Sequence, residues 1–198
     1  LEREIVLIGL GMSFFLFSSL ELYANISQNY SSVTFSDIRV VNPTFIISPD
    51  ITDEKGFTAD AGMRGTWSSY LSYDIGAFSM IYNDRIGTIL VESGPNKGDR
   101  VRQNIGDAWI YGTEIFADWN TLKTLGLKTD KFRINPFVNL AITNSEYISS
   151  LENNVEGKKV EFIPFINLKT GLRTKYIVLR TNVQFTYLCV QLTVAEYI

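Results

Sequence analysis

The stretch FRINPFVNLAITNSEY, residues 132–147, alternates between two unlike rows of side chains. The row that starts at Phe132 reads Phe, Ile, Pro, Val, Leu, Ile, and the row that starts at Arg133 reads Arg, Asn, Phe, Asn, Ala, Thr, Ser. A period of two indicates a β-strand with one apolar face and one polar face. Ordinary strands have about five or six residues. A strand this long therefore needs an apolar environment on one side and a wet one on the other.

The same alternation recurs along the whole chain. It predicts about eight long strands and no helix. Besides 132–147, the alternating segments are residues 8–16, 20–28, 57–67, 71–82, 108–120, 159–173 and 178–191. The first segment also has the charged start and apolar run of a signal peptide. However, Ile8, Leu10 and Met12 alternate with glycines and Ser13, which favours a strand over a transmembrane helix of about 20 apolar residues.

The connections between these segments differ in length in a regular way. Short connections alternate with long ones, and the exceptions are a middling connection at 121–131 and a polar loop at 149–158. The short ones are 17–19, 69–71 and 175–177, and the long ones are 29–56 and 83–107. Short turns on one side and long loops on the other are typical of a transmembrane β-barrel. In lipid, only a closed barrel satisfies the backbone groups of every strand, and about 10 residues are enough to span.

Aromatic side chains are numerous and gather near the strand ends. They predict two girdles at the two membrane interfaces, where amphipathic rings prefer to lie. Near the short turns are Trp67, Tyr70, Tyr73, Trp119 and Tyr176, and near the long loops are Tyr30, Tyr82, Trp109 and Tyr147. Aromatic residues also favour strands in general. The remaining alternative is a soluble β-sandwich, whose strands alternate too but are shorter.

Composition excludes several classes of function. The chain of 198 residues has no His, which removes Ser-His and Cys-His catalysis and His-ligated zinc, and its single Cys cannot form an internal disulfide or a cysteine metal cluster. The net charge of −3 gives no basic surface for nucleic acid. Glu114 and Asp118 lie about 13 Å apart if both are on one strand face, which suits a wet face better than a catalytic carboxylate pair. No enzyme activity, cofactor or metal site is expected.

Several phrases of the chain, taken together, point to one family. They are ELYANISQNYSSVTFSDIRVVNP (21–43), DEKGFTADAGMRGT (53–66), YNDRIG (82–87), YGTEIFADWN (111–120) and NNVEGKKVEFIPFINLKTGLR (153–173). In these phrases and their order the chain resembles TonB-dependent outer-membrane receptors, most closely those of the ferric-citrate type. The resemblance implies a barrel of about 22 strands whose lumen is filled by an N-terminal plug. It also departs from the family near the C-terminus, at Cys189, Val190 and Val194.

The resemblance implies a domain assignment and partners. Residues 1–198 correspond to a late part of the β-barrel, and the plug, the TonB box, the early strands and the final strands lie outside them. The expected partners are outer-membrane lipid, an iron chelate as ligand, and TonB acting through the plug. The expected location is the bacterial outer membrane. A complete eight-stranded barrel with a structural role is the alternative, because eight strands are the smallest usual number.

Arginines in the predicted long loops are candidate ligand contacts. Arg39, Arg85 and Arg102 lie there, and guanidinium groups bind carboxylates through paired hydrogen bonds. An iron chelate of citrate type is anionic, so these three residues are the predicted ligand-binding set. Loop arginines are also common as ordinary solvated charges. No metal-ligating residues are predicted, and the acidic segment 51–54 lacks the ligand spacing of a calcium loop.

Overall fold

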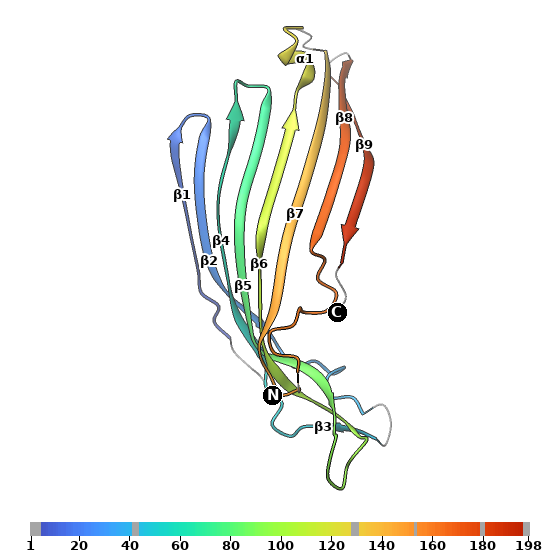
Figure 1. The fold of residues 1–198 in the computed structure, drawn as a ribbon. Coiled ribbons are helices and arrows are strands. Elements are labelled where there is room, and N and C mark those ends of the chain that lie inside the picture. Colours follow the sequence, from blue (N-terminus) through green and yellow to red (C-terminus); the bar gives the residue numbers. More distant parts are fainter. Residues whose placement is uncertain (1–4, 41–43, 128–130, 153, 179–180, 196–198) are drawn as a thin grey trace.

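The computed structural model describes residues 5–40, 44–127, 131–152, 154–178 and 181–195. Eight long strands form one antiparallel sheet, in which each strand pairs with its neighbours in chain order (Figure 1). The strands are β1 (Gly9–Phe17), β2 (Leu20–Ser31), β4 (Glu54–Trp67), β5 (Leu71–Leu90), β6 (Arg100–Trp119), β7 (Phe132–Ser150), β8 (Ile166–Val178) and β9 (Thr181–Val194). The predicted antiparallel meander of about eight long strands is confirmed.

Two short elements depart from the meander. Strand β3 (Phe45–Ile47) pairs in parallel with the start of β6, between Phe45↔Arg100 and Ile47↔Arg102. Helix α1 (Thr121–Thr124) follows β6, and the Asn120 side chain caps it by accepting a hydrogen bond from the Lys123 N–H. The sequence predicted no helix, because a single turn is too short to show a hydrophobic period. No helix in the described part of the chain has the length and apolarity needed to cross a membrane.

The connections sort by length between the two ends of the sheet. Strands β1 and β2, β4 and β5, and β8 and β9 adjoin at one end, where α1 also lies, at the top of Figure 1. The connections β2–β4, β5–β6 and β7–β8 lie at the other. We call these the short-turn end and the long-loop end. This arrangement confirms the predicted sorting with one exception: the connection 120–131, which contains α1, is longer than the connection 91–99 at the long-loop end.

Three predicted boundaries are wrong. Residues 83–107 are not one long loop, because β5 runs to Leu90 and β6 begins at Arg100. The strand predicted at 159–173 begins at Ile166 instead, and the turn predicted at 175–177 lies within β8. Residues 179–180, between β8 and β9, lie outside the described residues. Polar side chains at the strand ends concealed the extensions, since alternation alone does not separate a wet strand from a loop.

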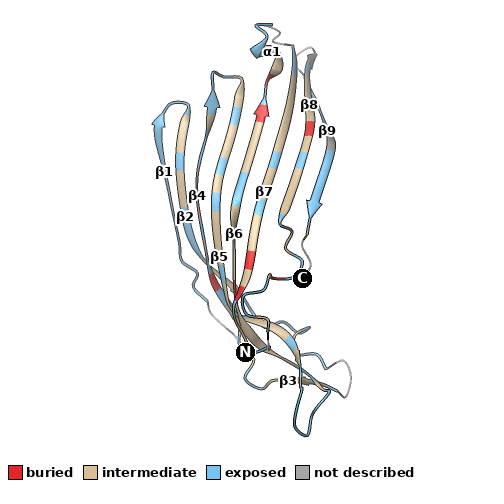
Figure 2. Ribbon diagram, in the orientation of Figure 1, coloured by how far each residue is buried: buried red, intermediate tan, exposed pale blue. Residues whose placement is uncertain are grey.

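The sheet is a single layer with almost no interior. Among the described residues, the buried hydrophobic side chains are Ala108, Tyr147 and Val160, and all three gather toward the long-loop end. Figure 2 shows most of the rest of the sheet as intermediate or exposed, with a few scattered buried positions. A β-sandwich would bury side chains between two sheets. The structure therefore excludes the soluble sandwich for the described residues.

The sheet is open, with β1 at one edge and β9 at the other. Strand edges expose unpaired N–H and C=O groups, which lipid cannot satisfy. The eight long strands of this chain thus form a segment of a barrel wall and do not close as a complete eight-stranded barrel.

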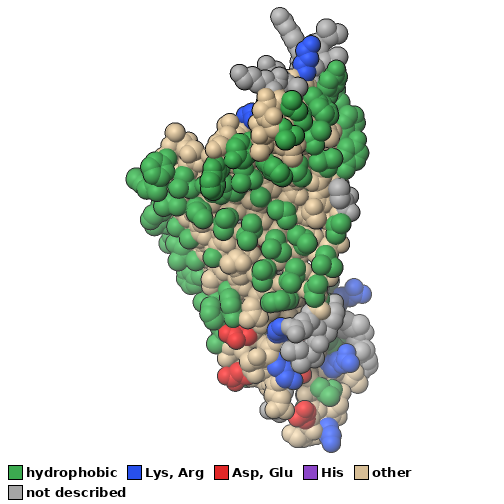
Figure 3. Space-filling view, turned by 45° about the horizontal axis from the view of Figure 1, so that its top comes forward, with side chains coloured by type: hydrophobic (Ala, Val, Ile, Leu, Met, Phe, Trp, Pro, Cys, Tyr) green, Lys and Arg blue, Asp and Glu red, His purple; other side chains and the backbone are tan. Residues whose placement is uncertain are grey.

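One face of the sheet is a broad apolar band. On it, the outer row of β7 (Ile134, Pro136, Val138, Leu140) pairs with the matching row of β8. Figure 3 shows the band as nearly continuous hydrophobic side chains, bounded by charged residues toward the long-loop end. An exposed apolar area this large is what a membrane-facing surface requires. We call this the outer face and its opposite the inner face.

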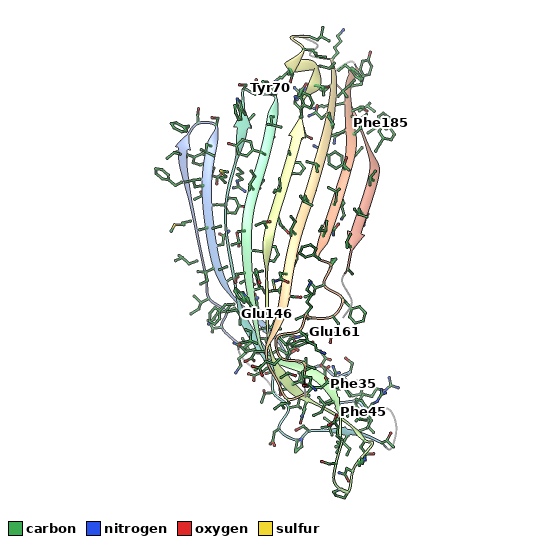
Figure 4. The ribbon with its side chains drawn as sticks, in the orientation of Figure 1. Phe35, Phe45, Tyr70, Glu146, Glu161 and Phe185 are labelled. Carbon is green, nitrogen blue, oxygen red and sulfur yellow. The ribbon has the colours of Figure 1, made fainter. Side chains whose placement is uncertain are left out.

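The predicted aromatic girdles are confirmed at one end and partly wrong at the other. Register places Trp67, Tyr73, Trp119 and Tyr176 on the outer face at the short-turn end. Tyr70 lies in the β4–β5 turn at the same end (Figure 4). At the long-loop end, Tyr30 and Trp109 are also on the outer face, but Tyr82 and Tyr147 pair with Ala108 on the inner face. Alternation already assigns Tyr82 and Tyr147 to the inner row, because the register runs unbroken from Leu71 to Tyr82 and from Phe137 to Tyr147. The prediction took nearness to the loops into account and left out the face.

Candidate functional site

Hydrogen-bonded polar side chains cover the inner face across β2, β4 and β5. The guanidinium of Arg64 donates two hydrogen bonds of 2.9 Å to the carboxylate of Glu21, its register partner on β2. The Tyr23 hydroxyl crosses β4 and donates to Asp74 on β5 at 2.9 Å. It can do so because Gly62 lies between them: a Cβ there would be 2.5 Å from the hydroxyl oxygen. A glycine thus lets one aromatic ring lie flat across the next strand.

A second polar cluster lies on the inner face toward the short-turn end. The Arg173 guanidinium on β8 donates to Asp118 on β6 at 3.0 Å, and the Asn135 amide on β7 donates to the same carboxylate. Arg173 also lies over the Phe137 ring, at 5.6 Å from its centroid. Asp118 is almost buried, with 7% of its surface exposed. Strands β6, β7 and β8 are therefore joined by charge-assisted bonds as well as by the backbone ladder.

Between these clusters the inner face is hollowed by a shallow cavity of about 250 Å³. Tyr23, Asp60, Asp74, Glu114 and Asn139 are among its lining residues. Glu114 and Asp118 share the inner face, as predicted, but only Glu114 lines the cavity, whereas Asp118 bonds Arg173. The interpretation of this pair as part of a wet face agrees with that geometry. Within the described residues, no group of three or more Cys, Asp or Glu side chains is arranged to hold a metal ion.

Arg85 lies at the long-loop end, where β5 is bulged. Its guanidinium donates to the Tyr147 hydroxyl at 3.1 Å and lies 5.4 Å from the centroid of the Tyr147 ring. The Tyr147 hydroxyl donates in turn to Glu161 at 2.6 Å. Glu161 belongs to the β7–β8 loop and is labelled in Figure 4. Arg85 therefore connects this loop to the strands through Tyr147.

Arg102 lies near the start of β6. Its guanidinium forms an ion pair with Asp37, in the loop between β2 and β3, and donates to the Thr88 hydroxyl at 3.4 Å. The other oxygen of Asp37 accepts hydrogen bonds from the Thr34 N–H, at 2.8 Å, and the Thr34 hydroxyl, at 2.5 Å. These bonds from Thr34, chiefly the hydroxyl, together with Arg102 lower the pKa of Asp37 from 3.8 to about 2. The carboxylate is thus charged at any physiological pH.

Arg39 lies in the same loop, two residues beyond Asp37, and its side chain is exposed. The ion pair between Arg102 and Asp37 brings the start of β6 to the segment that carries Arg39. Arg85 contacts a different loop through Tyr147. All three predicted arginines thus lie at the long-loop end, but in two different settings, and only Arg39 is fully exposed.

The sequence of residues 7–194 matches the family described as TonB dependent receptor-like, beta-barrel. This match covers nearly the whole chain. The chain belongs to the TonB-dependent receptor β-barrel family. No curated protein matches it in sequence.

Solved receptor structures share the fold. The ferric citrate transporter FecA in its unliganded form is 21% identical, with a TM-score of 0.59 over 92% of this chain and 25% of that one. The ferric yersiniabactin uptake receptor FyuA from Yersinia pestis is 16% identical, with a TM-score of 0.56 over 89% and 24%. The copper transporter OprC is 18% identical, with a TM-score of 0.57 over 83% and 23%. The chain spans about a quarter of the length of each.

Several residues that organise the long-loop end of this chain were missed by sequence reasoning. Asn104 is the main one: its side-chain oxygen accepts from the Thr52 N–H at 2.7 Å, and its amide donates to the Thr52 carbonyl at 2.9 Å and to the Asp84 carbonyl. Asp37 and Glu161 were missed in the same way. Each joins segments far apart in the sequence, and polar loop residues carry no local pattern that marks such a partner.

Proposed function

We propose that residues 1–198 form a late part of the barrel wall of an outer-membrane receptor that takes up an anionic iron chelate, ferric citrate or another siderophore, by TonB-dependent transport. The observation that carries this proposal is the single-layer sheet of the receptor family, with an apolar outer face and a polar inner face. Such a sheet is stable only with lipid on one side and water or polar protein on the other.

The receptor's place in the membrane follows from the two ends of the sheet. In bacterial outer-membrane barrels, short turns face the periplasm and longer loops face outward. The connections β2–β4, β5–β6 and β7–β8 would then face the medium, from which the ligand arrives. Trp67, Tyr73, Trp119 and Tyr176 would lie at the periplasmic interface of the bilayer.

The ligand class rests on charge at the long-loop end and on the solved relatives. Arg39, Arg85 and Arg102 supply guanidinium groups there, which suit the carboxylates of a citrate-type chelate. Two of the structural relatives named above are a ferric citrate transporter and a ferric yersiniabactin receptor. Arg39 is the most accessible of the three arginines and is the first contact we assign.

Energy coupling is assigned to parts of the receptor outside residues 1–198. A plug in the lumen would contact TonB, and the polar inner face of β2 to β8 would surround that plug. The inner-face bonds between Glu21 and Arg64 and between Asp118 and Arg173 would keep this wall rigid while the plug moves. No residue of the chain is assigned a catalytic role.

The test is ligand binding by the full-length receptor in detergent. The receptor is expected to bind ferric citrate more tightly than a neutral siderophore, and Arg39→Ala is expected to weaken ferric citrate binding at low salt. A hydrogen bond to a charged group contributes about 1.5–3 kcal/mol, and less when it is exposed to solvent. The matched control is Lys97→Ala, which removes an exposed cation from the β5–β6 loop.

Three results would each contradict a different part of the proposal. An Arg39→Ala receptor with unchanged affinity removes Arg39 from the ligand contacts. A receptor that binds the neutral siderophore better rejects the anionic ligand. Equal losses for Arg39→Ala and Lys97→Ala would show a general effect of charge and no specific contact.

A further inference from the structure

The ion pair between Arg102 and Asp37 is incomplete. Asp37 offers Arg102 only one of its two oxygens, because the other oxygen accepts from the Thr34 N–H and hydroxyl. On Arg102, Nη2 bonds Asp37 and Nη1 bonds Thr88, but Nε is buried and has no hydrogen-bond partner among the described residues. A carboxylate that bonded Nε and Nη2 together would form the paired geometry that guanidinium groups favour.

The position of Arg102 does not depend on Asp37. The Arg102 carbonyl accepts a hydrogen bond of 2.9 Å from the Ser48 N–H, and its backbone pairs with Ile47 of β3. On its other side, Arg102 is the register partner of Thr88 on β5. If the Asp37 carboxylate leaves, the guanidinium therefore stays at the long-loop end on a strand held from both sides.

We propose that Asp37 is a built-in competitor for Arg102, and that a carboxylate-bearing ligand binds by displacing the Asp37 carboxylate from the guanidinium. This inference rests on the proposed function, because it concerns the same anionic chelate. Displacement gives Arg102 a second hydrogen bond, through Nε, which Asp37 leaves unmade. It also detaches segment 33–40, which carries Arg39, from the β5–β6 hairpin. Arg39 then becomes free to move toward the same ligand.

The competition has a measurable consequence for affinity. Asp37→Asn removes the competing charge but keeps the size of the side chain, so the full-length receptor should bind ferric citrate about two- to fivefold more tightly, as expected for loss of a partly exposed ion pair. The matched control is Asp50→Asn, which removes an exposed carboxylate from the segment between β3 and β4 and should leave affinity unchanged. Equal tightening in the control would overturn the proposal, since it would reflect net charge alone.

A double-mutant cycle separates this inference from the proposed function. Arg102→Ala and the charge-keeping Arg102→Lys should both weaken ferric citrate binding. Asp37→Asn should give no further gain in the Arg102→Ala background, where no cation is left to compete for. If the Arg102 variants bind less and Asp37→Asn does not bind more, the competitor idea fails alone. If the Arg102 variants bind normally, the ligand contact fails as well. A wild-type receptor that binds no ferric citrate contradicts both proposals.

A second measurement follows the displaced segment. Hydrogen exchange of the backbone amides in 33–40 should become faster when ferric citrate binds, because the segment loses its contact with β6. A ligand that simply covered this loop would slow the exchange. Slower or unchanged exchange would therefore overturn the displacement.

Discussion

The middle of the sheet and its long-loop end consist of the same strands but are held together differently. In the middle, β4 and β5 pair without interruption from Lys55↔Asn83 to Trp67↔Leu71. At the long-loop end, the β5–β6 register shifts after Tyr82, and Asp84 adopts a φ of 59°. A positive φ is uncommon outside glycine and marks a backbone that its neighbours hold in place.

The difference lies in which groups supply stability. In the middle, the structure shows the backbone ladder, an apolar outer face and polar contacts on the inner face, and few side chains are buried (Figure 2). At the long-loop end, side chains bond backbone groups of distant segments: Asn104 holds Thr52, and Glu54 accepts from the Ile86 N–H at 2.7 Å. The middle should therefore be sensitive to which face a residue occupies, and the long-loop end to the loss of single polar groups.

The largest expected effect tests which face of the sheet, in its middle region, meets lipid. Leu140→Arg in the full-length receptor should cost about 2–4 kcal/mol of folding free energy if Leu140 lies at the bilayer midplane, whereas Asn139→Arg on the inner face should be nearly neutral. Refolding into lipid vesicles under urea titration measures both. Equal costs at the two positions would contradict the assignment of the outer face to lipid.

The next effect concerns close strand packing on the inner face. A Cβ at Gly112 would lie 2.3 Å from the Ile142 carbonyl oxygen and 3.0 Å from the Phe78 ring. Because the nearest atom belongs to the backbone, Gly112→Ala must push β6 and β7 apart and should cost about 1–3 kcal/mol. The same urea titration measures it, with Thr113→Ala on the outer face as the neutral control. A Gly112→Ala receptor as stable as the control would show that the strands can separate freely here.

A smaller effect is expected from one polar side chain at the long-loop end. Asn104→Ala removes the hydrogen bonds to Thr52 and Asp84, each worth about 1 kcal/mol in net terms. Hydrogen exchange should accelerate around residues 48–54 and 84–86, while amides in the middle of β4 and β5 stay protected. Exchange that rises equally in both regions would show that the long-loop end and the middle unfold as one unit.

The smallest effect is a dependence on pH confined to the β2–β3 loop. The pKa of Asp37 is lowered from 3.8 to about 2. The stability that the charged Asp37 carboxylate gives to the β2–β3 loop is therefore fully present above about pH 4 and is lost as pH falls through about 2. Segment 33–40 should then exchange faster at low pH while the strands keep their protection. An Asp37→Asn receptor should lack this change. If the hydrogen-exchange protection of segment 33–40 is already lost well above about pH 4, the pKa of Asp37 is not lowered.

Side-chain alternation and connection lengths were sufficient to predict the architecture of the barrel wall. Alternation over 132–147 predicted a long strand with unlike faces, and β7 contains all of it. Connection lengths predicted which strand ends lie together, and the family match supports the barrel. These features are readable because a barrel wall has a simple rule: each residue faces lipid or the wet interior, and the faces alternate.

Only the tertiary structure decided the long-loop end. Alternation stops being informative where β5 runs on to Leu90 and β6 begins at Arg100, because the β5–β6 register shifts after Tyr82. The sequence placed Arg39, Arg85 and Arg102 in the right region, but it gave no sign that Arg102 is paired with Asp37 across 65 positions of the chain. Such pairs depend on how distant segments fold back over one another. The sequence alone therefore determined the wall, where neighbours along a strand share one environment, and the fold determined the contacts at its end, where the partners are distant in sequence.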